Sequence, residues 1–117
     1  MRIDGEAKLL RIFVGESDKY FHTPVYEKIV LEARSAGLAG ATVFRGIMGF
    51  GGSSRVHTAK ILRLSEDMPL IVEIVDELKK IEAFIPLIEN IFEQAGCGGL
   101  ITIEKAEIIR YTSAGPG

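Results

Sequence analysis

Residues 40–55 have the sequence GATVFRGIMGFGGSSR, in which a strand-like run opens directly into a glycine-rich loop. The charge around this stretch is one-sided. Residues 33–65 contain no Asp or Glu but five Arg or Lys side chains, whereas the whole chain has a formal charge of −2. Backbone N–H groups near glycines can line an anion pocket, and arginine donates paired hydrogen bonds to phosphate. The stretch therefore predicts an anion site that includes Arg45.

The segment before this loop contains two predicted strands and a helix. Residues 7–14 alternate between two faces, as a strand does. Thr23 is expected to cap a helix whose first position is Pro24, where a missing N–H costs nothing, and Gly37 is expected to end it. Residues 41–48 then predict the second strand.

The segment after the loop repeats that order. Residues 59–65 predict an extended return, and the β-branched run 70–75 is typical of an interior strand. Helical spacing then runs from Leu78 to Gly96. Pro86 interrupts this helix, and we expect it to kink the helix or to lie near its true start.

Residues 100–111 predict the last strand, and a change of apolar parity within it predicts a bulge at Glu104-Lys105. The order of elements is thus β-α-β, long loop, β-α-β. This order predicts an α+β, ferredoxin-like split β-α-β fold with a four-stranded antiparallel sheet and two helices on one face. Because the strands carry apolar residues on both faces, the sheet needs a second cover, and oligomerisation is the simplest source of one.

Length and composition limit the class of protein. A chain of 117 residues suits a single domain over 1–117, with its core at about 7–111 and a mobile loop at about 49–65. We expect no membrane span and no signal peptide, because no apolar run is long enough. The single cysteine, Cys97, fits a reducing cytoplasm. The acidic balance, with a pI of about 5.7, disfavours nucleic-acid binding.

Catalytic and metal sites are not predicted. The two histidines, His22 and His57, lack ligand spacing to a cysteine or to each other, so we expect no metal. Acylphosphatases share the expected fold and use an arginine beside a glycine-rich turn, but they need a water-placing side chain, commonly Asn, and Asn90 lies on the second helix. The alternative to a binding protein is a small enzyme acting on a phosphorylated or acidic metabolite, with Arg45 holding the anion and His57 as acid or base. No nucleophile, base and orienting group form a recognisable set, so the sequence favours a protein that is not an enzyme.

Five short motifs are spread along the chain: GLAGATVFRG at 37–46, GFG at 49–51, Met68-Pro69, Gly98-Gly99 and Ile109-Arg110. Together they resemble the PII signalling superfamily, and more closely its PII-like branch long catalogued as a domain of unknown function. The resemblance covers nearly the whole chain, from about Leu9 to Arg110.

This resemblance implies a homotrimer whose sheets face a central axis and whose clefts between subunits bind adenine nucleotides. It also implies which residues line each cleft, with the C-terminal arginine coming from the neighbouring subunit. Together with Arg45, taken from the charge pattern, the expected nucleotide-binding residues are Thr42, Arg45, Gly49, Phe50, Gly51, Gly52, Ser53, Gly98, Gly99 and Arg110.

The chain departs from that superfamily at two positions where better-known members place phosphate-binding lysines. It has Leu70 near the first of them and Gly99 near the second. Each lost charge-assisted hydrogen bond is worth about 1.5–3 kcal/mol, so AMP or ADP is a better expected ligand than ATP. The resulting hypothesis is a non-catalytic sensor in which a bound nucleotide orders the 49–65 loop and changes its fit to a target protein. We expect no cofactor besides this ligand.

Overall fold

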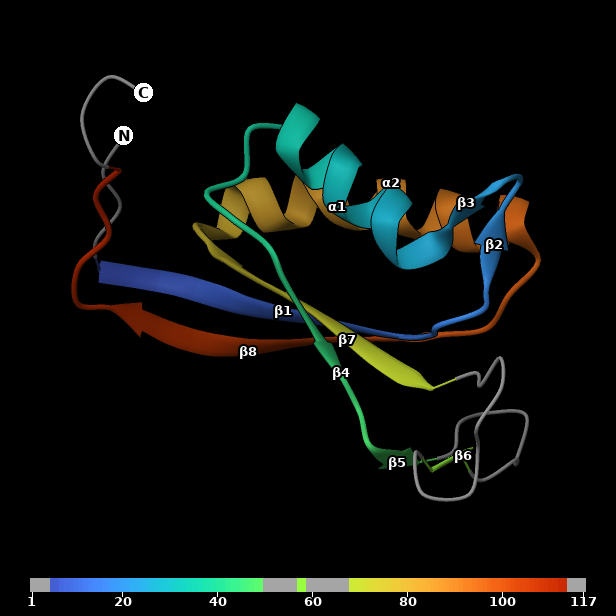
Figure 1. The fold of residues 1–117 in the computed structure, drawn as a ribbon. Helices are drawn as coiled ribbons and strands as arrows, with labels where there is room; N and C mark the ends of the chain where they lie inside the picture. Colours follow the sequence, from blue (N-terminus) through green and yellow to red (C-terminus); the bar gives the residue numbers. More distant parts are fainter. Residues whose placement is uncertain (1–4, 50–56, 59–67, 114–117) are drawn as a thin grey trace.

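The computed structural model describes residues 5–49, 57–58 and 68–113 (Figure 1). Four long strands, two helices and two small two-stranded ladders make up this part of the chain. In order they are β1 (Gly5–Gly15), β2 (Lys19–Tyr20), β3 (Thr23–Pro24), α1 (Val25–Ser35), β4 (Thr42–Arg45), β5 (Met48–Gly49), β6 (His57–Thr58), β7 (Pro69–Asp76), α2 (Leu78–Ala95) and β8 (Leu100–Ile108).

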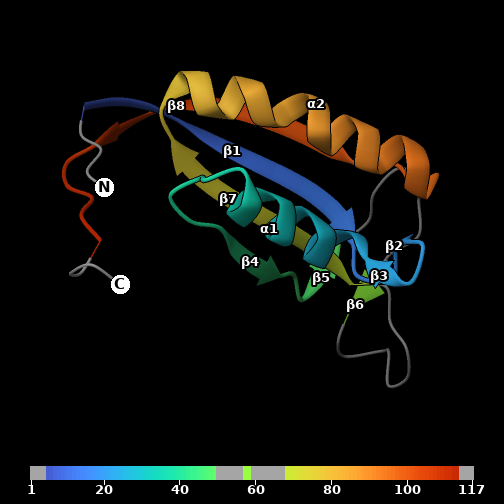
Figure 2. The same ribbon diagram turned by 90° about the horizontal axis from the view of Figure 1, so that it is seen from above.

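The main sheet has four strands in the order β4-β7-β1-β8, and each neighbouring pair is antiparallel. Both helices lie on one face of this sheet, which is plain when the molecule is seen from the side and from above (Figures 1 and 2). Strands β1 and β7 are central, while β4 and β8 form the edges. The expected ferredoxin-like split β-α-β fold is confirmed.

The hydrophobic core lies between the sheet and the helices. Alternate residues of β1 and β7 face the helices because side chains on a strand alternate between its faces. The helices meet them with residues spaced three and four apart, which share one helix face. The largest fully buried apolar side chains include Leu10, Ile12, Ile29, Val72, Ile74, Ile81, Phe84 and Ile88.

The first helix begins later than the sequence predicts. Thr23 is not its cap: Thr23 and Pro24 pair with Tyr20 and Lys19 in a short ladder, and the helix begins at Val25. A residue before proline prefers extended backbone, so Thr23 suits a strand better than a helix cap. No side-chain hydrogen bond caps this helix.

The predicted end of the first helix is confirmed at Gly37. Its φ is +79°, a conformation that suits glycine. The Gly37 N–H donates to the Arg34 carbonyl at 3.1 Å, and the Leu38 N–H donates to the Ala33 carbonyl at 3.1 Å. These two bonds form a Schellman motif, which satisfies carbonyls that the helix end leaves open.

The second helix runs through Pro86 without a break in its assignment. A helix start near Pro86 is therefore wrong. Proline removes one helical hydrogen bond, and that loss is offset here by a face of four buried residues, Ile81, Phe84, Ile88 and Ile91. The helix ends as predicted at Gly96, whose φ is +67°.

The second strand is shorter than predicted. Its main-sheet part is β4, residues 42–45, and the chain leaves the sheet at Gly46 before β5 pairs with β6. The predicted loop over 49–65 lies outside the described residues except for Gly49, His57 and Thr58, and the extended return over 59–65 lies wholly outside them.

The last strand has no bulge. The β1–β8 register runs unbroken from Phe13 opposite Leu100 to Gly5 opposite Ile108, and the strand ends there rather than at residue 111. Ile101 lies on the helix-covered face and Ala106 on the opposite one. The apolar residues of β8 thus move from one sheet face to the other along the strand, with no residue inserted. The sequence pattern of such a change is the same as that of a bulge, which inserts one residue.

Candidate functional site

The sheet face opposite the helices carries an apolar row that crosses all four strands. In the ladders Phe44 lies beside Ile71, Ile71 beside Phe13 and Phe13 beside Leu100. Paired residues of antiparallel strands share a face. Phe44 is 49% exposed and Leu100 is 54% exposed in the single chain. The prediction of apolar residues on both sheet faces is thus confirmed.

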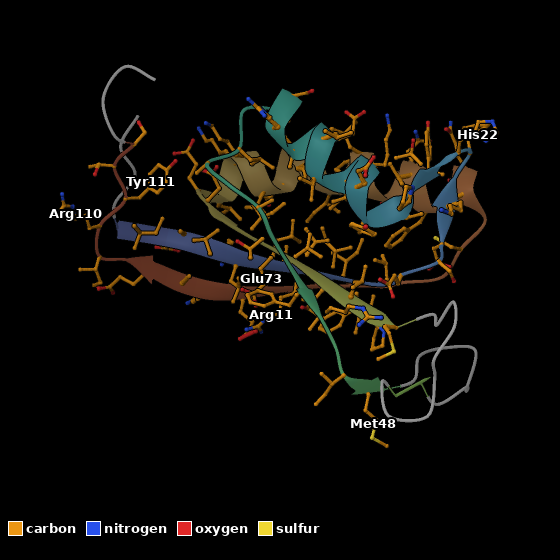
Figure 3. The ribbon with its side chains drawn as sticks, viewed as in Figure 1. Arg11, His22, Met48, Glu73, Arg110 and Tyr111 are labelled. Carbon is orange, nitrogen blue, oxygen red and sulfur yellow. The ribbon has the colours of Figure 1, made fainter. Side chains whose placement is uncertain are left out.

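A charged cluster lies beside this row on the same face. Arg11 pairs with Glu73 in the next row (Figure 3), and Glu104 lies one row further, opposite Leu9. The Arg11 Nε donates to the Glu73 carboxylate at 2.8 Å, and its Nη1 donates to Glu104. The hydrogen bond to Glu73 and the negative charge of Glu104 raise the pKa of Arg11. The Arg11 guanidinium is therefore already paired with two carboxylates of its own sheet.

An open groove of about 540 Å³ lies between the C-terminal segment and the start of β4. This volume is within the range of small-molecule sites. The Tyr111 hydroxyl donates to the Ala39 carbonyl at 2.9 Å and joins the two walls. The groove brings together two predicted site residues, Thr42 and Arg110; its other lining residues are Ala39, Gly40, Ala41, Glu73, Val75, Ile108, Ile109 and Tyr111.

The other described site residues lie toward the opposite end of the sheet. Arg45 ends β4 beside Leu70, and the turn Gly98-Gly99 precedes Leu100. Figure 3 shows the separation: Arg110 lies at one end of the molecule and Met48, next to Gly49, at the other. Eight residue steps of β8 span about 26 Å, so one chain does not bring Gly99 and Arg110 together.

Arg45 is neutralised by a carboxylate from outside the acid-free window. Its Nη2 lies 3.1 Å from the Glu16 Oε1, in the turn that follows β1. Glu16 is 29 residues away in the sequence. The unbalanced positive charge expected from residues 33–65 is therefore reduced at this position by the fold.

Gly99 is required by packing, whatever its role in binding. A Cβ there would lie 2.5 Å from the Phe92 Cζ and 3.1 Å from the Phe13 carbonyl oxygen. A Cβ added at Gly98 would have no neighbouring atom within 4 Å.

We expect Gly99→Ala to lower the free energy of unfolding by about 1–3 kcal/mol, the usual cost of overpacking. Gly98→Ala is the matched control and should change it by less than about 0.5 kcal/mol. Urea denaturation of both variants measures the difference. Equal stability of the two variants would contradict the packing role of Gly99.

The remaining predicted positions are only partly described. Phe50, Gly51, Gly52 and Ser53 lie outside the described residues. Gly49 approaches Pro69, whose Cγ would lie 3.2 Å from an added Cβ, so its small size has a packing reason. His57 pairs with Gly49 through the backbone of β6.

The described part of the chain offers little support for a metal site, a membrane span or a reactive thiol. His, Cys, Asp and Glu side chains there form no group of three that could hold a metal ion. Neither helix is both long and apolar enough to cross a membrane. Burial, followed by the charge of Asp18, raises the pKa of the Cys97 thiol, which disfavours its reactive thiolate form.

The sequence did not reveal Asp76 as a structural carboxylate. It is fully buried at the end of β7 and accepts hydrogen bonds from the backbone N–H groups of Ala39 at 2.8 Å and Glu77 at 2.7 Å. It thereby holds one wall of the groove against the sheet. The contact of Asp76 with Ala39 joins residues 37 positions apart, so the sequence carries no local signal for it.

Comparison with known proteins agrees with this architecture. A UPF0166 protein of Aquifex aeolicus is 39% identical over 87% of this chain and 92% of its own length. A UPF0166 protein of Methanocaldococcus jannaschii is 33% identical over 90% of this chain and 94% of its own length.

Among solved structures, the chain is similar to CPII, a nitrogen regulatory PII-like protein from Thiomonas intermedia K12, in a structure bound to ADP, AMP and bicarbonate. The TM-score is 0.67 at 14% identity, and the match covers 92% of this chain and 91% of CPII. The shared feature is the fold. The profile of the DUF190 family, described as Uncharacterized ACR, matches residues 7–108. Since that match spans most of the sequence, the chain belongs to the DUF190 family and has a PII-like fold.

Proposed function

We propose that this protein is a non-catalytic regulator that binds AMP or ADP between the subunits of a homotrimer. The observation that carries the proposal is the separation of Arg110 from the turn Gly98-Gly99 by the length of the sheet. A site that uses both needs two copies of the chain. In the proposed arrangement, Arg45 and the glycines of one subunit face Arg110 of the next.

The open sheet face supports the trimer. Its apolar row, Phe44, Ile71, Phe13 and Leu100, lacks the cover that the helices supply to the other face. Burial of apolar surface stabilises association by about 25 cal/mol per Å² before the costs of association. Packing this face around a threefold axis would cover the row in every subunit.

The ligand class follows from the charges near the proposed cleft. Arg110 is exposed, so it can meet a phosphate that the next subunit holds. Leu70, near one position where better-known PII proteins have lysine, is only 3% exposed and packs in the core. Fewer cations favour a nucleotide with fewer phosphates. CPII, which shares the fold, was solved with ADP and AMP bound.

The proposed output is a change in the 49–65 loop, which begins at Gly49, four residues after the end of β4. A phosphate that contacts Arg45 and the residues after Gly46 would order this loop, and ordering of a segment by phosphate contacts is an established kind of switch. The ordered loop would then engage a target protein. We place this activity in the cytoplasm, where the single cysteine, Cys97, would stay reduced.

AMP and ADP should each raise the melting temperature of the protein more than ATP does. A ligand that binds only the native state stabilises it by about 2.7 kcal/mol at one hundred times its Kd. A thermal-shift titration with the three nucleotides, with guanosine monophosphate as the matched control, measures the order. No stabilisation by any adenine nucleotide below millimolar concentration would contradict the proposed function.

A further inference from the structure

Glu16 and Arg45 form an ion pair at the sheet end from which the predicted loop departs. The Arg45 Nε lies 3.2 Å from Glu16 Oε1 and 3.3 Å from Oε2, and its Nη2 lies 3.1 Å from Oε1. The carboxylate thus faces the Nε–Nη2 edge of the guanidinium. This forked edge is suited to a carboxylate or a phosphate.

The backbone fixes both partners on the same end of β7. The Glu16 N–H donates to the Met68 carbonyl at 2.8 Å, and the N–H of Gly46, the residue after Arg45, donates to the Pro69 carbonyl at 2.7 Å. The two side chains therefore start from neighbouring, hydrogen-bonded backbone positions. They remain accessible to a ligand, because the side chains of Glu16 and Arg45 are 33% and 52% exposed.

The carboxylate competes with a phosphate for Arg45 in either of two ways. A phosphate that takes the Nε–Nη2 edge must displace Glu16. A phosphate that takes the remaining N–H groups binds close to a fixed negative charge, which repels it. Two unit charges about 6 Å apart in water repel enough to weaken binding about threefold, and each further charge on the ligand adds a smaller factor because it lies farther from Glu16.

We propose that Glu16 is a specificity-determining residue that disfavours nucleotides in proportion to the charge of their phosphates. This inference rests on the proposed function, in which Arg45 contacts the phosphate. It adds a cause for the preference for AMP and ADP over ATP that differs from the missing lysines. The missing lysines remove attraction for phosphate, whereas Glu16 adds repulsion.

The test compares Glu16→Gln with the wild-type protein by calorimetric titration of AMP, ADP and ATP at low ionic strength. Glutamine keeps the size of the side chain and one acceptor oxygen, so it removes the charge while leaving a partner for Arg45. The matched control is Glu32→Gln, which also breaks an ion pair, with Lys28 at 2.7 Å on α1. A melting curve verifies that each variant is folded.

We expect Glu16→Gln to bind ADP about threefold to tenfold more tightly, with a smaller gain for AMP and a larger one for ATP. Glu32→Gln should stay within about twofold of wild type. Binding by wild type with an unchanged or weakened affinity in Glu16→Gln would overturn the role of Glu16 and leave the proposed function standing. If neither protein binds any of the three nucleotides, both the proposed function and this inference are wrong.

Discussion

Arg110→Gln is expected to weaken the proposed ADP binding by about 10- to 100-fold while leaving the proposed trimer intact. The side chain is exposed at the rim of the groove, and no carboxylate in the described part of the chain forms an ion pair with it. Its loss therefore removes one charge-assisted contact to phosphate, worth about 1.5–3 kcal/mol, and leaves no buried group unpaired. Calorimetric titration measures the affinity, and light scattering measures the mass.

The matched control for Arg110 is Lys105→Gln. Lys105 is an exposed cation on β8, the strand that precedes Arg110, and it lies on the opposite sheet face from Ala106. Its loss changes the net charge of the chain equally and should alter ADP affinity by less than about twofold. Equal losses in the two variants would mean that Arg110 acts only through long-range charge and makes no contact with the ligand.

Leu100→Glu is expected to convert the proposed trimer into single chains of 12.8 kDa. Leu100 is 54% exposed and ends the apolar row of the open sheet face. In the proposed trimer the glutamate would be buried without a partner, which costs several kcal/mol for each subunit. Light scattering at micromolar concentration measures the mass, and circular dichroism verifies that the fold persists.

A leucine on the outer surface of α1 offers a close control. Leu31 is 53% exposed, almost as much as Leu100, but belongs to the helix layer. Leu31→Glu should leave the mass unchanged, because a surface substitution away from an interface is usually within about 0.5 kcal/mol of neutral. A trimer that survives Leu100→Glu, or dissociates equally in both variants, would show that the open face is not the interface.

The fold could be predicted because its main signals are local. Period-two alternation identified β1, a β-branched run identified β7, and the glycines at 37 and 96 identified the ends of both helices. These signals depend on neighbouring residues, which a sequence shows directly. The prediction failed at Thr23, where a small tertiary ladder competed with a helix cap for the same residue.

The candidate site could be predicted only in part, because its contacts join distant residues. Arg45 meets Glu16, which lies 29 positions earlier, and Tyr111 meets Ala39, which lies 72 positions earlier. A window free of acidic residues indicated positive charge at Arg45, but it could not show a carboxylate arriving from another strand. The resemblance to PII proteins supplied Thr42 and Arg110, and the structure brings these two to one groove.

Mixing two binding-defective variants tests the central claim, a nucleotide site shared between subunits, most directly. Arg45→Gln and Arg110→Gln chains are unfolded together and refolded, so that trimers form at random, and ADP sites are counted by calorimetry. If each site takes Arg45 from one subunit and Arg110 from the next, about one quarter of the sites should regain wild-type affinity. No recovery in mixed trimers of verified composition would contradict the shared site.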